Sequence, residues 1–269
     1  MNILLLGDIM GPSGRKAIVE KLPNLIKKKK IDFVILNGEN AADPGVGITK
    51  EIVEEFLEVG ADVITTGNHV WDQREAMEFI TKEKRLLRPE NLIKGSPGNG
   101  FGIFNAKNNK KVAVINLMGN IFMKKCEDVF QAAEKFIQTV RLKKDADFII
   151  VDIHGEITSE KMAMGYLFDG KATMVVGTHT HVPTSDHRIM EKGTAYQTDV
   201  GMCGDYNSVI GMNRDNSLKK FLKNPSATKH YPADGEATIS GAMVIANDKT
   251  GLANKVEPIV LGRLLENRI

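Results

Sequence analysis

The sequence is poor in the residues that would mark several specialised classes of protein. It has two cysteines, Cys126 and Cys203, in 269 residues, too few for a disulfide-stapled scaffold, so a reducing cytoplasm is the expected location. Basic and acidic residues nearly balance, and the net charge of +2 makes no strong case for nucleic acid or an anionic membrane as a partner. The N-terminal apolar run reaches Asp8 almost at once, and no other apolar run is long enough to span a membrane.

Aromatic residues are also scarce, at 6% of the chain with a single tryptophan. Trp71, Phe101 and Phe104 are interpreted as core residues rather than as a platform on which bases stack. Cys203 has no evident positive neighbour that would activate its thiol, so we interpret it as structural rather than nucleophilic.

What the sequence does contain is the composition of an ordinary globular protein, 42% hydrophobic and 26% charged. Up to about residue 177, apolar runs alternate with segments whose apolar residues recur at helical spacing, which predicts an α/β sheet. The expected strands are Asn2–Gly7, Phe33–Leu36, Val63–Thr66, Lys111–Leu117, Phe148–Val151 and Met174–Gly177. The expected helices are Arg15–Lys30, which Pro23 could bend or break, a helix capped by Thr49 that runs to Leu57, Asp72–Ile80, Glu127–Val140 and Ser159–Phe168.

The pattern then changes. Ala195–Val200, Ala237–Ala246 and Lys255–Leu261 predict strands with no helices between them, which indicates a second, partly antiparallel sheet. Residues 201–235 are polar and rich in glycine, asparagine and aspartate, with one short helix expected near Leu218–Leu222. A connection of this length is typical of a lid or binding loop. We predict one domain over residues 1–269, in which two sheets share a core.

Five of the predicted strands lead into residues that can bind a metal. The carboxyl ends of strands in an open α/β sheet form the rim at which ligands bind. Four of the six histidines lie at such ends, whereas His187 and His230 lie elsewhere, and surface placement is expected for His230. The residues at the strand ends are Asp8, Glu39 with Asn40, Asn68 with His69, His154, and His179 with His181.

Each of these residues has an ordinary interpretation when it stands alone. Asp8 could cap a helix, Asn68 after a glycine could serve a turn, and a His-x-His pair such as His179 and His181 is weak evidence for a site. Together they form a mixed nitrogen and oxygen set that suits Zn, Mn, Fe, Co or Ni rather than Ca. The set is too large for one tetrahedral ion, and it suits two ions about 3.5–4 Å apart that share a carboxylate and activate a water for attack on phosphorus.

The same residues resemble the motifs of the calcineurin-like metallophosphoesterase superfamily, in their usual order. The match is closer to its YmdB-like subfamily, which hydrolyses 2′,3′-cyclic nucleotides, and it runs from Asp8 past Ala242. The resemblance rests on Gly38-Glu39-Asn40-Ala41-Ala42, Gly67-Asn68-His69-Val70-Trp71-Asp72, Thr158-Ser159-Glu160-Lys161, Gly177-Thr178-His179-Thr180-His181 and Thr198-Asp199-Val200-Gly201-Met202. It implies a four-layer αββα sandwich, in which two mixed sheets are flanked by helices.

Two departures from the wider superfamily are shared with the subfamily. Met10 stands where the superfamily has a histidine, and Glu39 stands where it usually has an aspartate. The resemblance implies that Asp8, Glu39, Asn40 and His181 hold one metal ion, and that Glu39 also bridges to a second. Asn68, His154 and His179 would complete that second site, and His69 would remain free as the general acid. Spacing alone does not say which histidine stays unligated.

The function implied by the resemblance is a binuclear-metal phosphodiesterase. Its substrates would be small cyclic nucleotides, 2′,3′-cyclic and by extension 3′,5′-cyclic monophosphates, attacked by a metal-bridging hydroxide while His69 protonates the leaving oxygen. The expected cofactors are two transition-metal ions, iron or manganese before zinc, cobalt or nickel. Asp152, Glu156, Asp186 and Asp199 are the residues expected to orient the imidazoles, without a ranking among them.

Two other functions compete with this hypothesis. A different metal hydrolase, such as an amidohydrolase barrel, would need further strand–helix units where this chain becomes all-β. A regulatory protein that senses a nucleotide or docks a partner, with slow phosphatase activity, is the alternative we keep. The basic run Lys27–Lys30 is interpreted as a solvated helix end rather than a phosphate-binding patch. The sequence does not decide whether the protein forms a homo-oligomer.

Overall fold

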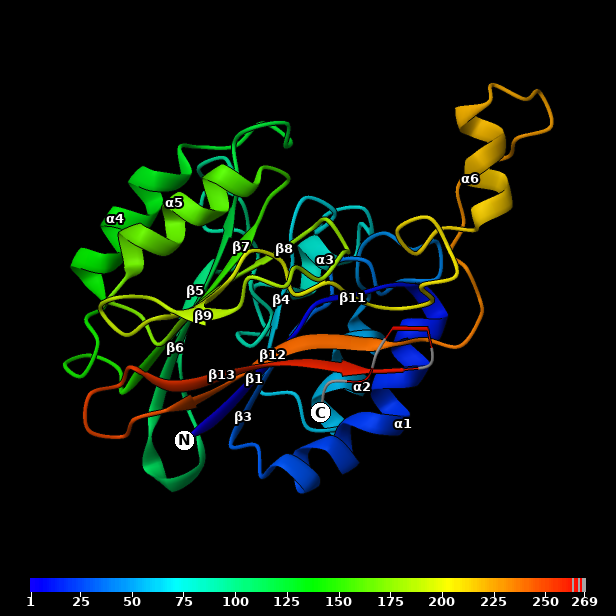
Figure 1. Cartoon of the computed structure of the whole chain (residues 1–269). Helices are drawn as coiled ribbons and strands as arrows, with labels where there is room; N and C mark the ends of the chain where they lie inside the picture. Colours follow the sequence, from blue (N-terminus) through cyan, green and yellow to red (C-terminus); the bar gives the residue numbers. More distant parts are fainter. Residues whose placement is uncertain (263, 266, 268–269) are drawn as a thin grey trace.

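Two large β-sheets form the centre of the computed structural model, which describes residues 1–262, 264–265 and 267 (Figure 1). The strands of the first sheet are β1 (Asn2–Leu6), β3 (Phe33–Asn37), β4 (Val63–Thr65), β12 (Ile239–Ala246) and β13 (Ala253–Leu261), in the spatial order β13-β12-β1-β3-β4. The second sheet has the order β5-β6-β7-β8-β10-β9. Its strands are β5 (Phe101–Asn105), β6 (Lys111–Met118), β7 (Phe148–His154), β8 (Met174–Thr178), β9 (Arg188–Ile189) and β10 (Ala195–Gln197).

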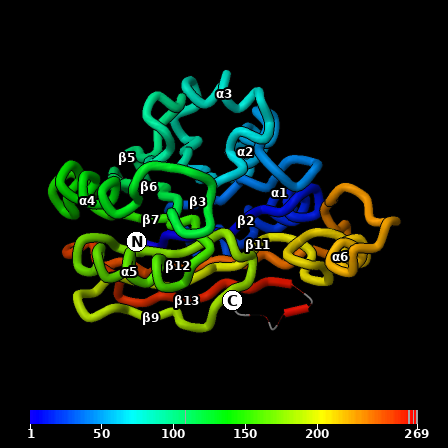
Figure 2. The backbone as a smooth tube through the Cα atoms, turned by 90° about the horizontal axis from the view of Figure 1, so that it is seen from above, coloured from blue at the N-terminus to red at the C-terminus, as the bar shows by residue number. Residues whose placement is uncertain are grey.

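Helices cover the outer face of each sheet. The first sheet is covered by α1 (Gly11–Lys29), α2 (Lys50–Glu58) and the short α3 (Ala76–Phe79), and the second by α4 (Val129–Thr139) and α5 (Thr158–Phe168). A sixth helix, α6 (Arg214–Phe221), extends from the side of the molecule in both views (Figures 1 and 2). A 3-10 turn, η1 (Lys107–Asn109), joins β5 to β6. Within the described part of the chain, no helix combines the length and the apolar character needed to cross a bilayer.

The side-chain alternation of the strands builds three apolar layers between the four layers of backbone. Successive side chains on a strand point to opposite faces. In β1, Leu4 faces the helical layer that contains Phe56, whereas Leu5 faces the second sheet. In β7, Ile150 lies in the layer between the sheets and Ile149 packs toward α4 and α5. The central strands are apolar throughout because both of their faces are buried, and the expected αββα sandwich is confirmed.

The prediction that the last strands make a separate sheet is wrong. β12 pairs antiparallel with β1, and β13 pairs antiparallel with β12, so both extend the first sheet. β10 is shorter than expected and joins the second sheet, parallel to β8. Each sheet is therefore mixed. In the first, β12 adds antiparallel to the edge of β1 that the βαβ units leave unpaired. In the second, β5 pairs antiparallel with β6, and β9 pairs antiparallel with β10.

Helix boundaries differ from the predictions where special residues intervene. α1 begins at Gly11 rather than Arg15, because Pro12 fits the first turn of a helix. Pro23 lies inside α1 without ending it. The predicted helix Asp72–Ile80 is helical over Ala76–Phe79. Thr49 caps α2 as expected, since its side chain accepts a hydrogen bond from the Ile52 N–H.

The segment from 201 to 235 contains two regular elements. β11 (Met202–Cys203) pairs with β2 (Asp8–Ile9), which directly follows β1. α6 begins at Arg214, four residues before the predicted helix, because the Asn213 side chain caps it by accepting from the Asn216 N–H. The segment therefore starts beside the first strand end and continues to an exposed helix.

Candidate active site

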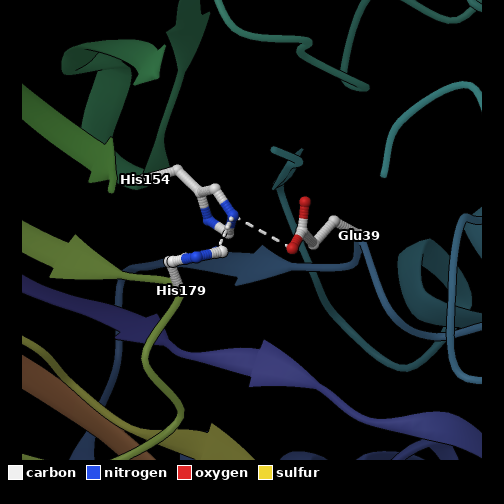
Figure 3. A group of neighbouring side chains, drawn as sticks. All are labelled: Glu39, His154 and His179. Atoms are coloured by element: carbon white, nitrogen blue, oxygen red, sulfur yellow. Dashed lines mark hydrogen bonds and ion pairs between the residues drawn. The ribbon is translucent and has the colours of Figure 1, made fainter. Parts of the chain in front are cut away.

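The carboxyl ends of strands from both sheets converge on one cluster of polar side chains. β3 leads to Glu39, β7 ends at His154, and β8 leads to His179, and these three side chains come from opposite sheets to meet (Figure 3). Their potential ligand atoms lie within 4.8 Å of one another. The rim predicted from the sequence therefore forms where the two sheets meet.

Glu39 and His154 are at the centre of this cluster, and both are buried. The Glu39 Oε1 lies 3.0 Å from the His154 Nε2. The His179 Nδ1 lies 3.1 Å from the same His154 nitrogen, and the Asn68 Oδ1 also lies 3.1 Å from it. Four side chains thus direct donor atoms at one point.

Asp8 and His181 extend the cluster on the other side of Glu39. The Asp8 Oδ1 lies 3.7 Å from the His154 Nδ1 and 3.8 Å from the His181 Nε2. The Asn40 amide nitrogen bridges Glu39 Oε1, at 3.1 Å, and His181 Nε2, at 3.2 Å. A 180° rotation of that amide would present its oxygen instead. All seven predicted ligands are therefore brought together.

His69 lies beside the cluster, and its ring pairs with Asp72 rather than with a predicted ligand. Its backbone N–H donates to the Glu39 Oε2 at 3.1 Å, whereas its Nδ1 pairs with the Asp72 Oδ2 at 2.6 Å. The ring is 30% exposed. With Nδ1 paired to Asp72, Nε2 is the ring nitrogen left for a bound molecule. Asp72 is thus the orienting partner of His69. No role was predicted for Asp72 from the sequence, although its position three residues after His69 was a usable signal.

Hydrogen bonds behind the cluster fix the orientation of its histidines. His154 Nδ1 pairs with the Thr178 hydroxyl at 2.9 Å, and that hydroxyl donates to Asp152 at 2.8 Å. His181 Nδ1 contacts the Ile210 carbonyl oxygen at 2.7 Å. These contacts leave the Nε2 of both rings directed into the cluster, which is how metal-binding histidines are commonly held.

The four carboxylates expected to orient the imidazoles have different roles. Asp152 acts through Thr178, and Glu156 lies 3.2 Å from the His179 Nε2. Asp199 accepts from the backbone N–H and the hydroxyl of Thr180, between the two histidines of the His-x-His pair. Asp186 contacts no site histidine and binds the backbone and hydroxyl of Thr198 instead.

A buried lysine, Lys161, supports the loop that carries His179 and His181. The Lys161 Nζ donates to Asp199 Oδ2 at 2.7 Å and to the Thr178 carbonyl oxygen at 2.8 Å, and both charged groups are about 1% exposed. His179 and His181 have φ angles of 96° and 65°, a region that L-residues seldom adopt. We infer that the Lys161–Asp199 pair holds the strained backbone that carries both histidines.

Glycines allow the close approach of the strand ends. A Cβ atom on Gly67 would overlap the Glu39 carboxylate and the His154 ring, and one on Gly177 would overlap the Thr198 carbonyl oxygen. Gly67-Asn68-His69 and Gly177-Thr178-His179 thus need glycine for space.

Burial and neighbouring charges shift the pKa values of several cluster residues. Burial raises the pKa of Asp8 above its ordinary value. Burial also disfavours the charge of Glu39, but His154 outweighs it and lowers the pKa of Glu39 to about 2. Glu39 likewise outweighs the burial of His154 and raises the pKa of that imidazole to about 9. Burial and the neighbouring His154 lower the pKa of His179 to about 3, so that His179 is a neutral electron-pair donor.

One buried atom indicates what the cluster could hold. Within the described residues, the Asp8 Oδ1 is buried and accepts no hydrogen bond. An unsatisfied buried carboxylate oxygen is unfavourable unless a cation compensates it. With two carboxylates, two amides and three imidazoles around it, the site fits transition-metal ions.

The remaining residues considered from the sequence lie outside the cluster. Burial raises the pKa of the Cys203 thiol to about 12, so it is not a ready nucleophile. Phe101 packs edge-on against Phe136. Trp71 is partly buried and packs against the apolar layer between the first sheet and its covering helices. Two further residues complete this group: Phe104 packs against the layer between the sheets, and His230 is exposed.

Comparison with known proteins agrees with this arrangement. Residues 4–259 match the family model described as YmdB-like protein. The chain is 44% identical over 261 residues to a 2′,3′-cyclic-nucleotide 2′-phosphodiesterase of Bacillus subtilis (strain 168), covering 97% of both chains. It also matches the crystal structure of a novel phosphatase from Mycoplasma pneumoniae, with 36% identity, a TM-score of 0.89 and coverage of 97% of this chain and 93% of that one. A hypothetical protein from Thermus thermophilus is similar, with 35% identity, a TM-score of 0.88 and coverage of 98% and 100%.

The sandwich, the donor cluster at its rim and these relatives define the class: the chain is a phosphoric-ester hydrolase with a metallophosphoesterase-like fold. Within that class it belongs to the YmdB-like protein family.

Removing one partner of the buried Lys161–Asp199 pair should be strongly destabilising. Lys161→Met would leave a buried carboxylate without its cation, and we expect the free energy of unfolding to fall by about 3–5 kcal/mol. Lys143→Met is the matched control, because Lys143 pairs with Asp147 at the same 2.7 Å but in a partly exposed position, where about 0–1 kcal/mol is expected. Urea denaturation measures both, and equal losses would contradict the assigned role.

Asp8→Asn should change stability in a direction that depends on metal. In metal-stripped protein we expect an unchanged or higher Tm, because the variant removes a buried charge whose Oδ1 accepts no hydrogen bond. In wild type, added Mn²⁺ should raise Tm, since a ligand that binds the folded state stabilises it, and in the variant this rise should shrink. Asp186 is a hydrogen-bonded carboxylate outside the cluster, so the control variant Asp186→Asn should leave the Mn²⁺ effect intact. An Mn²⁺ response that is the same in wild type and Asp8→Asn would rule out a cation at Asp8.

Proposed function

We propose that this protein hydrolyses 2′,3′-cyclic nucleotides with the help of two bound metal ions. The observation that carries the proposal is the convergence of Asp8, Glu39 and three histidines from both sheets, with the Asp8 Oδ1 left without a hydrogen bond. The 2′-phosphodiesterase from Bacillus subtilis, similar over 97% of its length, supports the choice of substrate. Extension to 3′,5′-cyclic nucleotides is part of the same proposal.

The donor atoms divide into two groups on either side of Glu39. Asn40 and His181 form one group, and Asn68, His154 and His179 form the other. Asp8 lies between them, with its Oδ1 3.8 Å from the His181 Nε2 and 3.7 Å from the His154 Nδ1. Glu39 contacts both groups through Oε1, which supports a bridging role. When bound, such ions would polarise the phosphoryl oxygens and lower the pKa of a water. Iron and manganese are the proposed ions, with zinc, cobalt and nickel as alternatives.

His69 is proposed as the general acid. Asp72 holds its Nδ1, so the Nε2 can carry a proton toward the leaving group. The attacking water releases one proton to solvent as its oxygen forms the new bond to phosphorus, and the bond from phosphorus to the ribose 2′ oxygen breaks. That oxygen takes the proton from His69 Nε2, which yields a nucleoside 3′-monophosphate, and His69 is reprotonated from solvent.

The rest of the chain supports the site in this proposal. The whole chain would act as one domain, with residues 201–235 as a wall and lid, because the Ile210 carbonyl oxygen holds His181. Both cysteines are unpaired, which supports a cytoplasmic location. Lys29 pairs with Glu257 at 3.5 Å, which supports a structural role for that part of the basic run.

Replacement of His69 tests the mechanism. His69→Ala should lower kcat for 2′,3′-cyclic AMP by roughly 10²–10⁴-fold, the usual contribution of a general acid, while the metal content stays that of wild type. Asp72→Asn should lower kcat less, because it misorients His69 without removing it. Steady-state kinetics and metal analysis on the same preparations measure both effects.

His187→Ala serves as the control, since His187 lies outside the cluster. Unchanged turnover in His69→Ala would refute the general-acid role. A regulatory protein that works by docking alone would keep its cellular function in His69→Ala, which distinguishes that alternative.

A further inference from the structure

The connection between β6 and α4 is attached to the site at two points. At its start, the Gly119 N–H donates to the His154 carbonyl oxygen at 3.0 Å. Further along, the Lys124 Nζ donates to the Asn68 carbonyl oxygen at 2.7 Å and lies 3.4 Å from the Asp72 Oδ1. Since β6 and β7 run parallel and end together, at Met118 and His154, this connection rises directly from the active-site rim (Figure 1). Both anchors therefore bind backbone carbonyl oxygens of cluster residues, His154 and Asn68.

Phe122 lies between these two anchors and is unusually exposed. Its side chain is 85% exposed, and the neighbouring Ile121 is also exposed. Its φ is 60°, a conformation that is a rare outlier for a bulky residue. Residues in such conformations persist where the surroundings hold them, and they concentrate at ligand-binding sites. The chain therefore holds a strained backbone that presents an aromatic ring to solvent at the rim.

The other exposed aromatic side chains do not share this position. Among the described residues they are Tyr166 on α5, Phe221 on α6 and Tyr231 beyond it. Their segments also have anchors at the site, through Lys161 on α5 and Ile210 before α6. Those anchors are five or more residues away along the chain, whereas Phe122 stands two residues from Lys124. In a chain with so few aromatics, this placement points to a ligand with a flat apolar face.

We propose that Phe122 forms a nucleobase subsite, on which the base of the nucleotide stacks while its phosphate lies at the cluster. The inference rests on the proposed function, which places a nucleotide at this site. Every base has a π-face, so stacking on one ring favours nucleotides over sugar phosphates without selecting among bases. Lys124 positions the ring by tying the connection to Asn68 and Asp72, next to His69.

The experiment compares ligands with and without a base. Phe122→Asn removes the ring, and asparagine tolerates positive φ, so the backbone is preserved. Phe122→Trp keeps an aromatic face. We expect the KM for 2′,3′-cyclic AMP to rise about tenfold or more in Phe122→Asn, as for the loss of a stacked base, and to stay near wild type in Phe122→Trp. Neither variant should change turnover of ribose 2′,3′-cyclic phosphate, which has no base.

Calorimetric binding of adenosine 3′-monophosphate to the metal-loaded protein makes the test independent of catalysis. A weaker Kd in Phe122→Asn supports the subsite, even if wild type hydrolyses no cyclic nucleotide and the proposed function fails. The control Phe221→Asn, which removes a similarly exposed ring on α6, should leave binding unchanged. An unchanged Kd in Phe122→Asn, no measurable binding to wild type, or an equal loss of activity on the base-free substrate would overturn the subsite.

Discussion

Buried negative charge is the constraint on which the rest of this structure depends. Asp8 and Glu39 leave adjacent parallel strands of the first sheet and are almost fully inaccessible to water. A buried carboxylate is stable only when hydrogen-bonded, paired or bound to a cation. Imidazoles that arrive from the second sheet supply part of that compensation, through His154 at 3.0 Å from Glu39. The packing of the two sheets therefore brings the buried carboxylates and the imidazoles that compensate them to the same rim.

Much of the surrounding structure follows from this arrangement. Glycine at 67 and 177 lets backbone and side chains approach closely. Thr178 and Asp152 fix the ring of His154, while Lys161 and Asp199 hold the strained loop that carries His179 and His181. The donor cluster of this YmdB-like protein is thus built from strand ends and maintained by a buried polar network behind them.

The sequence predicted the parts of the fold that depend on local pattern. Continuous apolar runs marked the strands that are buried on both faces, and the polar residues after them marked the rim, so the seven predicted ligands are found together. The placement of β12 between β1 and β13 could not be read from the sequence, because strand pairing over such separations leaves no local signal. The roles of Asp72, Lys161 and Phe122 likewise depend on contacts or backbone angles that only the folded chain has.

The proposed function requires the cluster around Glu39 to be a two-ion centre for phosphoester hydrolysis. Metal analysis of purified protein, stripped and then titrated with manganese or iron while hydrolysis of 2′,3′-cyclic nucleotides is followed, tests it most directly. We expect activity to rise with metal content and to reach its maximum at two ions per chain. Full activity with fewer than two ions per chain would contradict it.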